Sequence, residues 1–523
     1  MPRITRTEWQ RVILFAVLLM ILTTFPYLVA WRSQNEDWKF SGFLFGAEDG
    51  NSYLTKMRIG AQGTWLFTIR YTSESHDGAL LFLPYILLGK LAALFANPDQ
   101  PDFSTALAVT FHLARIILGI PLILLYYRFA AHFLPHPASR MLALLLMTLG
   151  GGLGWVLEIA GRGEWLGSLP VDFYVPEGFS FLILFGLPHL ELARCGLLGG
   201  FLLFFNDQTW RGSLLAGLAW LMMGVCVPFY IAVLYVLLGC WGLAAWLQTR
   251  RFPWPLFWRA ITAALVPLPY LLYTSFVFLT NDVMGRWSAQ NNLPSPHPLH
   301  YLIGYGVLAV PAVVALHWVW RKRELPHLLL ASWIVVAPLL VYLPINVQRR
   351  LAEGILVPLS ILASAGLSLL FSHRKTWNRA RIAVLGLTLP TALLIWLGAT
   401  FSALHPSRPL FNPHPELAAM DRLNRLAPPD AVVLSSKDVS NYLTVQTDLH
   451  TYIGHGPETM NFKQKEQTVK RFFAGELDSL SVENLLKHVD YILASLDIET
   501  RTWAEDLNIL FSQDSVTVYE VKH

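Results

Sequence analysis

Charged side chains are scarce in this chain, and their scarcity sets the class of protein. Asp, Glu, Lys and Arg make up 14% of the 523 residues, whereas 54% are hydrophobic. A soluble domain carries about a quarter charged residues, so an ordinary soluble fold is excluded. The mean hydropathy of +0.45 agrees. The sequence therefore predicts an integral membrane protein.

Cysteine and an excess charge of one sign are also lacking. The three cysteines lie in apolar runs, and no Cys-x-x-Cys or Cys/His spacing suggests a zinc site, so we expect buried apolar thiols. The net charge is only +4, and the Lys and Arg residues gather in short loops between apolar runs. That distribution indicates membrane topology and membrane lipids as partners, with no nucleic acid.

Long apolar runs are what the chain has in place of charge. A bilayer span needs about 20 apolar residues. The run 213–247 is too long for one helix and is interrupted at Pro228, which predicts two short spans there. Together with nine other runs, this predicts eleven spans; the nine are 12–30, 104–127, 141–160, 181–205, 257–279, 299–319, 326–345, 351–371 and 382–400.

Loop charges orient these spans. Arg3, Arg6 and Arg11 precede the first run, which has no small-residue cleavage site, so we predict an uncleaved anchor with a cytoplasmic N-terminus. The later basic loops agree only if 79–96 does not cross, and we predict a re-entrant or interface-lying helix there. These loops contain Arg128 with Arg140, Arg211, Arg250 with Arg251, Arg321 to Arg323, and Arg374 to Arg381.

The tail differs from the rest of the chain in composition. Residues 1–400 are predicted to form a transmembrane domain with a long first outer loop, 31–103, and residues 401–523 an extracytoplasmic α/β domain. The fold class is mainly α, a polytopic helix bundle with a small α/β domain. Strands are predicted in the tail at 431–435, 451–453, 491–494 and 516–519, and helices at 415–426, 461–474 and 481–488.

Glu48 and Asp49 are the first candidate catalytic residues. They follow the first span, in a loop predicted to be outside the cytoplasm. The helical spacing from Tyr53 to Ile59 predicts a short helix on the bilayer with Asp49 near its start. A carboxylate pair at the water edge suits general acid or base chemistry; the alternative is a solvated turn.

Other outer loops supply candidate substrate-binding residues. Asp172 and Glu177 could serve a divalent metal or an acid/base pair, or simply be solvated. Arg349 and Arg350 suit a phosphate because the guanidinium donates two parallel hydrogen bonds. Lipid headgroups or an ion pair with Glu353 are the alternatives for this arginine pair.

Further candidates have lower rank. Arg286, with His297, lies in the outer loop 280–298 and could assist a phosphate site. His189 lies near the start of the fourth span with Glu191 and Arg194, which are three residues apart and could pair on one helix face. These three residues could instead line a substrate cavity.

The pattern resembles the GT-C superfamily of multi-pass glycosyltransferases that use polyprenyl-phosphate-linked sugars, in its bacterial type with an extracytoplasmic tail domain. The matching features are the acidic pair, the interface helices, the second span and the tail motif Gly454-His-Gly-Pro-Glu-Thr459. The interface helices match at 52–62 and 79–96. No Trp-Trp-Asp motif of oligosaccharyl transferases is present, so transfer of a whole glycan to Asn is not expected.

The resemblance implies an activity and a location. A sugar would pass with inversion from a lipid-linked donor to an acceptor on the outer side of a bacterial plasma membrane, in building the cell envelope. Asp49 would be the base, with Glu48 as the alternate, and Arg349 and Arg350 would bind the donor phosphate. No cofactor is predicted with certainty, and a divalent metal is left open. A transporter or flippase, and a non-catalytic scaffold or sensor, are the competing hypotheses.

The topology leads to a test. Because the basic loop 372–381 is followed by one span, a reporter fused after residue 523 should be active only outside the cytoplasm. Activity in the cytoplasm would contradict the eleven-span topology and would move the acidic loop to the other side.

Overall fold

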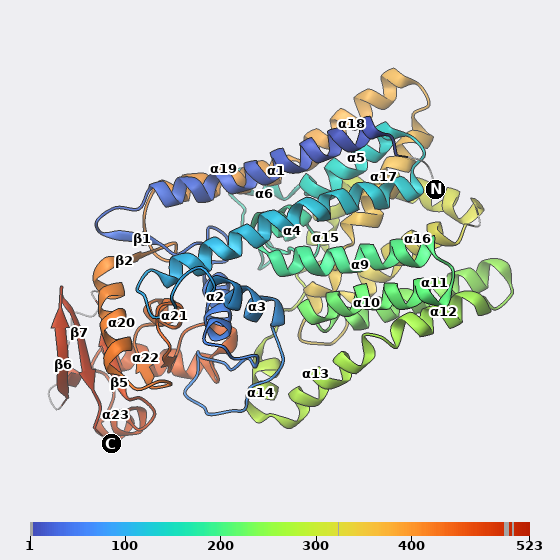
Figure 1. The fold of residues 1–523 in the computed structure, drawn as a ribbon. Coiled ribbons are helices and arrows are strands. Elements are labelled where there is room, and N and C mark those ends of the chain that lie inside the picture. The colour runs from blue at the N-terminus through green and yellow to red at the C-terminus, as the bar shows by residue number, and fades with distance from the viewer. Residues whose placement is uncertain (1–3, 323, 496–501, 505–506, 523) are drawn as a thin grey trace. The chain divides into compact units, whose positions relative to one another are not determined.

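The computed structural model describes residues 4–322, 324–495, 502–504 and 507–522 (Figure 1). Arg3, Arg323 and the C-terminal His523, which enter the topology prediction, lie outside the described residues. The chain forms two compact units. The first contains 1–24, 114–275 and 292–398, and the second contains 25–113, 276–291 and 399–523. The predicted division at residue 400 stays a prediction.

The first unit consists of helices. Four helices contribute to both units: α1 (Arg6–Arg32), α4 (Phe103–Phe133), α13 (Leu268–Thr280) and α19 (Pro390–Ala403). The others in the first unit are α5 (Pro137–Leu149), α6 (Gly154–Ile159), α7 (Val171–Tyr174), α8 (Ser180–Gly186), α9 (Pro188–Asn206), α10 (Trp210–Cys226), α11 (Tyr230–Thr249), α12 (Trp254–Ala264), α15 (Pro298–Lys322), α16 (Leu325–Leu340), η1 (Gln348–Ala352), α17 (Leu356–Leu370) and α18 (Arg374–Thr388).

These helices account for the predicted spans. Six helical runs among the described residues are long and apolar enough to cross a bilayer, and α12 with α13, bent by 50°, would make a seventh. Large apolar side chains such as Leu14, Leu18 and Ile21 are exposed along α1, as expected for a surface that faces lipid. The chain is an integral membrane protein. The break at Pro228 is confirmed, since it falls between α10 and α11.

Several segments differ in detail from the expected spans. The run 181–205 is divided between α8, which ends at Gly186, and α9, which begins at Pro188. The run 141–160 is not one helix, because α5 ends at Leu149 and α6 begins at Gly154. The intervening glycines allow close backbone packing: a Cβ on Gly152 would lie 2.4 Å from the Cα of Gly304 in α15. Within 79–96 only α3 (Leu83–Ala92) is helical. Its ten residues span about 15 Å, too short to cross the roughly 30 Å hydrocarbon core.

The second unit contains the tail sheet. Its strand order is β4-β3-β5-β7-β6, with β3 parallel to β4 and β5 and the remaining pairs antiparallel. A separate pair joins β1 (Trp38–Phe40) to β2 (Phe411–Pro413). The sheet strands are β3 (Val432–Leu434), β4 (His450–Thr451), β5 (Tyr491–Ala494), β6 (Asn508–Gln513) and β7 (Val516–Glu520).

The predicted tail elements are present. The helices are α20 (His414–Leu426), α21 (Lys437–Gln446), η2 (Gly456–Glu458), α22 (Phe462–Phe473), α23 (Ser479–Leu486) and η3 (Thr502–Ala504). Of the tail elements, α21, η2, η3, β2 and β6 were not predicted. The sequence of α21 is rich in β-branched and short polar residues, which have low helix propensity, so its burial in the fold determines it. β6 is a largely exposed edge strand, so its pairing with β7 determines it.

The helix of the first outer loop, α2 (Ala47–Ala61), lies at the centre of the second unit. Its residues Leu54 and Met57 are fully buried in a core with Tyr85 of α3 and Tyr442 of α21. The backbones of α2 and α3 touch, because a Cβ on Gly60 would lie 2.1 Å from the Ile86 carbonyl oxygen. One on Gly89 would lie 1.7 Å from the Met57 carbonyl oxygen. Only glycine permits this approach.

This contact leads to a stability test. Gly89→Ala should lower the free energy of unfolding by about 2–3 kcal/mol, because the two helices must separate to admit the methyl group. Gly386→Ala in α18 is the control, since its Cβ would meet no atom within 4 Å, and it should be neutral or slightly stabilising. Denaturant unfolding of the full chain in detergent measures both, and equal stability of the two variants would contradict the packing.

Candidate functional site

The acidic pair lies in the first turn of α2, in agreement with the sequence prediction of a helix starting near Asp49. The helix begins after Gly46, which has a left-handed φ of 58°, a conformation that favours glycine. Glu48 and Asp49 therefore lie at the positive end of the helix dipole. That end of a helix favours acidic side chains.

Glu48 is tied to the tail segment of the second unit. Its Oε1 accepts a hydrogen bond from the Gly456 backbone N–H at 2.9 Å, and its Oε2 pairs with Lys437 Nζ at 3.0 Å. Lys437 is the first residue of α21. Both carboxylate oxygens of Glu48 are thus engaged by groups of the tail.

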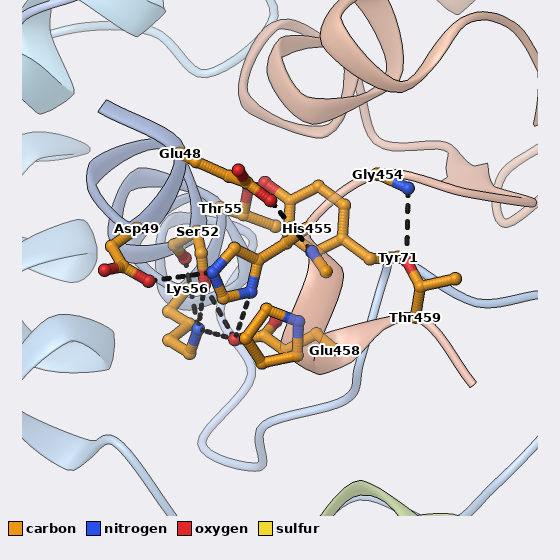
Figure 2. Close-up of polar contacts among 12 residues, drawn as sticks. Glu48, Asp49, Ser52, Thr55, Lys56, Tyr71, Gly454, His455, Glu458 and Thr459 are labelled. Carbon is orange, nitrogen blue, oxygen red and sulfur yellow. Dashed lines mark hydrogen bonds and ion pairs between the residues drawn. The ribbon is translucent and has the colours of Figure 1, made fainter. Parts of the chain in front are cut away.

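Asp49 is bound to His455 and is also exposed to solvent. Its Oδ1 lies 2.9 Å from Nε2 of His455, while 57% of its side chain is exposed. His455 itself is 7% exposed. Figure 2 shows the imidazole pointing at the Asp49 carboxylate from the tail loop. Asp49 is therefore the more accessible carboxylate of the pair and has a fixed orientation.

A buried layer lies behind His455. Nδ1 of His455 is 3.5 Å from Glu458 Oε1, and the same oxygen forms an ion pair with Lys56 Nζ at 2.6 Å (Figure 2). The Ser52 hydroxyl donates to this oxygen at 2.7 Å, and Lys56 donates to Ser52. Charges thus alternate from α2 to the tail and back: Lys56, Glu458, His455 and Asp49.

Lys56 is almost completely enclosed. Its side chain is 1% exposed, and its ammonium lies 4.5 Å from the ring centre of Phe82 and 5.1 Å from that of Phe67. A buried charge is tolerated only when it is paired and hydrogen-bonded. Removing one partner of such a pair costs about 3–5 kcal/mol, so the Lys56–Glu458 pair fixes the tail turn to α2.

The protonation states follow from these contacts. Burial by itself would lower the pKa of His455, but hydrogen bonding and attraction from Asp49 and Glu458 prevail and raise it to about 9. Burial would raise the pKa of Glu458, yet Lys56 and His455 lower it to about 2. At neutral pH His455 is therefore an imidazolium. It forms an ion pair with the Asp49 carboxylate and is not itself a base.

The candidates in the first unit form a separate group. Arg350 Nε lies 3.5 Å from Glu177 Oε1, and the Arg349 guanidinium lies 5.0 Å from the Tyr174 ring centre. Asp172 is buried, and its Oδ2 accepts hydrogen bonds from the Thr391 hydroxyl and the Gly152 N–H. The structure thus brings Arg350 and Glu177 together.

The ion pairs of Arg194 and Glu353 differ from those expected. Arg194 does not pair with Glu191. Its guanidinium binds both carboxylate oxygens of Glu353 at 2.8 Å, because Glu353 precedes α17 and lies beside α9. Glu353 is consequently not the ion-pair partner expected for the arginine pair at 349–350.

Two candidates remain apart from these groups. Arg286 lies on α14 (Asp282–Gln290) in the second unit and pairs with Asp282 at 2.9 Å. His189 lies in the first turn of α9. Among the described residues, no group of three or more His, Cys, Asp or Glu side chains is arranged to hold a metal ion.

Several residues at the acidic turn were missed in the sequence. The motif around His455 was noted only for its family resemblance, and no role was predicted for Lys56, Lys437 or Glu458. Lys56 is four residues after Ser52 and seven after Asp49, so all three lie on one face of a helix. This spacing was a usable signal. The partners in the tail lie about 400 positions later, and no spacing in the sequence indicated them.

Comparison with known proteins identifies the fold. No family model and no curated protein sequence matches the chain. Among solved structures, the apo oligosaccharyltransferase of Archaeoglobus fulgidus is 12% identical with a TM-score of 0.54, covering 92% of this chain and 69% of that one. ArnT of Cupriavidus metallidurans bound to undecaprenyl phosphate is 12% identical with a TM-score of 0.50, covering 99% of both chains. At such identity the likeness establishes the fold.

The charge chain predicts a pH dependence. His455 has a raised pKa in the folded protein, so its stabilising contribution is complete below its ordinary value of 6.5 and is lost as the pH rises through about 9. The loss should be of the order of 3 kcal/mol. Unfolding free energies measured from pH 6 to 10 should show this decline in the native chain but not in His455→Gln. Parallel curves for the two proteins would contradict the assignment.

Proposed function

We propose that this chain, which has the GT-C fold, is a membrane glycosyltransferase that moves a sugar from a polyprenyl-phosphate donor to an acceptor hydroxyl outside the cytoplasm. The observation that carries the proposal is the half-exposed, imidazolium-bound Asp49 at the start of α2. The structural neighbours support the donor class, because one of them holds undecaprenyl phosphate.

The reaction is a single displacement. The acceptor oxygen attacks the anomeric carbon from the face opposite the phosphate, and the bond from that carbon to the phosphate oxygen breaks. The lipid phosphate leaves with the bonding electron pair, and the acceptor proton passes to the Asp49 carboxylate. Configuration at the anomeric carbon is inverted. General base assistance of this kind contributes about 10²–10⁴ in rate.

The surroundings of Asp49 suit this role. The helix dipole and the His455 imidazolium attract negative charge at this position, and a carboxylate is a weak base. A weak base suffices when the acceptor proton becomes acidic late in the displacement, as the bond to the leaving group breaks. The fixed orientation supplied by His455 supports positioning as the larger contribution.

Glu48 is the alternate base, but its environment is less suited to the role. Both of its oxygens are occupied, by Lys437 and by the Gly456 N–H. A proton acceptor must be reachable by the substrate, and the Glu48 side chain is 39% exposed against 57% for Asp49. We therefore assign Glu48 to holding the tail against α2 and Asp49 to the chemistry.

The leaving phosphate needs charge stabilisation, for which we propose Arg349 and Arg350. Arg350 is about one-third exposed and pairs with Glu177 at 3.5 Å, a distance too long for a tight hydrogen bond. A phosphate can approach the exposed part of this guanidinium. Asp172 is bound by protein groups, which supports a structural role for it rather than direct substrate binding.

The test of the proposal is Asp49→Asn, which preserves shape but removes the base. Turnover with a polyprenyl-phosphate sugar donor should fall by about 10²-fold or more, while donor binding stays nearly unchanged. Glu48→Gln is the control and should be milder in turnover. Transfer rates and lipid binding are measured on the purified full chain. Normal transfer by Asp49→Asn would overturn the role of Asp49, and loss only in Glu48→Gln would exchange the two roles.

A further inference from the structure

Gln290, the last residue of α14, is bonded to the tail turn that carries His455. Its side-chain amide donates to the carbonyl oxygens of Pro457 at 2.9 Å and Thr459 at 2.7 Å. Its Oε1 accepts from the Asn461 N–H at 3.3 Å. One side chain thus makes three hydrogen bonds to a five-residue stretch that starts two residues after His455.

The hydrogen bonds within the turn use groups other than the Pro457 and Thr459 carbonyls. Its internal bonds run from the Glu458 and Thr459 N–H groups to the His455 carbonyl, at 3.0 and 2.9 Å. The Gly454 N–H donates to the Thr459 hydroxyl at 3.1 Å. These bonds close the turn. On the α14 side, Gln290 attaches the turn to the rest of the unit together with Met460, which is buried in the same cluster as α14 and whose N–H donates to the Thr72 hydroxyl at 3.5 Å.

The helix that carries Gln290 is itself anchored beside the buried ion pair. Val283, Met284 and Trp287 of α14 are buried in a cluster with Phe67 and Phe82. These are the two rings that enclose the Lys56 ammonium. The position of Gln290 is therefore fixed by packing, and its amide approaches the turn from a rigid helix.

The two faces of the turn are thus held by different parts of the chain. Glu48 and Asp49 of α2 bind it through Gly456 and His455. Gln290 of α14 binds it through Pro457, Thr459 and Asn461. The buried Lys56–Glu458 pair also holds the turn to α2, so releasing the Gln290 face loosens the turn on that side and weakens the orientation of the His455 ring without detaching it.

We propose that Gln290 is a positioning residue: it holds the 455–461 turn so that the His455 imidazole stays on the Asp49 carboxylate. It does not touch the reacting groups. Its effect on sugar transfer rests on the proposed function, whereas its effect on the order of the turn does not.

Hydrogen exchange of the full chain in detergent tests the positioning directly. In Gln290→Ala, the backbone amides of residues 455, 456 and 458–461 should exchange about tenfold faster, because three hydrogen bonds to the turn are lost. Gln290→Glu should behave alike, since a carboxylate cannot donate to the two carbonyl groups. The matched control is Gln464→Ala, an exposed glutamine on α22, and should leave exchange unchanged.

Transfer assays on the same variants complete the test. Gln290→Ala should lower kcat about tenfold with little change in KM for the lipid donor, because orientation and not binding is affected. Native exchange rates in both Gln290 variants would overturn the proposal. If the turn loosens but Asp49→Asn transfers sugar normally, the positioning role stands and the proposed function fails. If the turn loosens and Asp49→Asn is inactive while Gln290→Ala transfers at the native rate, the positioning has no catalytic consequence and this part is overturned.

Discussion

The ion pair between Lys56 and Glu458 is the interaction on which the second unit depends. It joins the helix of the first outer loop to a turn near the end of the chain, in a place where neither charge reaches water. An unpaired ammonium there would be very costly, so α2 and the turn form together or not at all. The same pair orients the groups next to it. Glu458 holds His455, and His455 holds Asp49, so a structural charge sets the direction of a surface carboxylate.

This arrangement separates two requirements that usually conflict in one side chain. A group that acts on a substrate must be reachable, but a reachable side chain on a loop is mobile. Here His455 and Glu458 are buried, whereas Asp49 is exposed. The helix dipole and the imidazolium attract the Asp49 carboxylate, and His455 of the tail fixes its orientation. Gln290 adds a third support from a helix that is far away in the sequence.

Much of the fold was predictable because apolar length and loop composition are local properties. The apolar runs fall on helical segments, of which six or seven among the described residues are long and apolar enough to cross a bilayer. The break at Pro228 lies where proline interrupts a helix, and the strands at 491–494 and 516–519 lie on short apolar or β-branched runs. The unpredicted α21 has weak propensity and is stabilised by packing against α2. Of the site, the acidic turn was predictable from its position after the first span. Its partners His455, Glu458 and Lys437 were not, because pairing across about 400 residues leaves no trace in local spacing.

The second unit is built from three distant stretches, 25–113, 276–291 and 399–523, and this affects how the chain can be made. Lys56 leaves the ribosome 402 residues before Glu458. At about 5–20 residues per second, Lys56 lacks its counter-ion for roughly 20–80 s during synthesis. During that interval α2 and α3 lack the packing that the tail provides. The Lys56 ammonium then lies near aromatic rings without its counter-ion. The second unit can close only when translation is nearly complete, so a truncation close to the C-terminus would leave a helix bundle whose acidic turn never acquires its orientation.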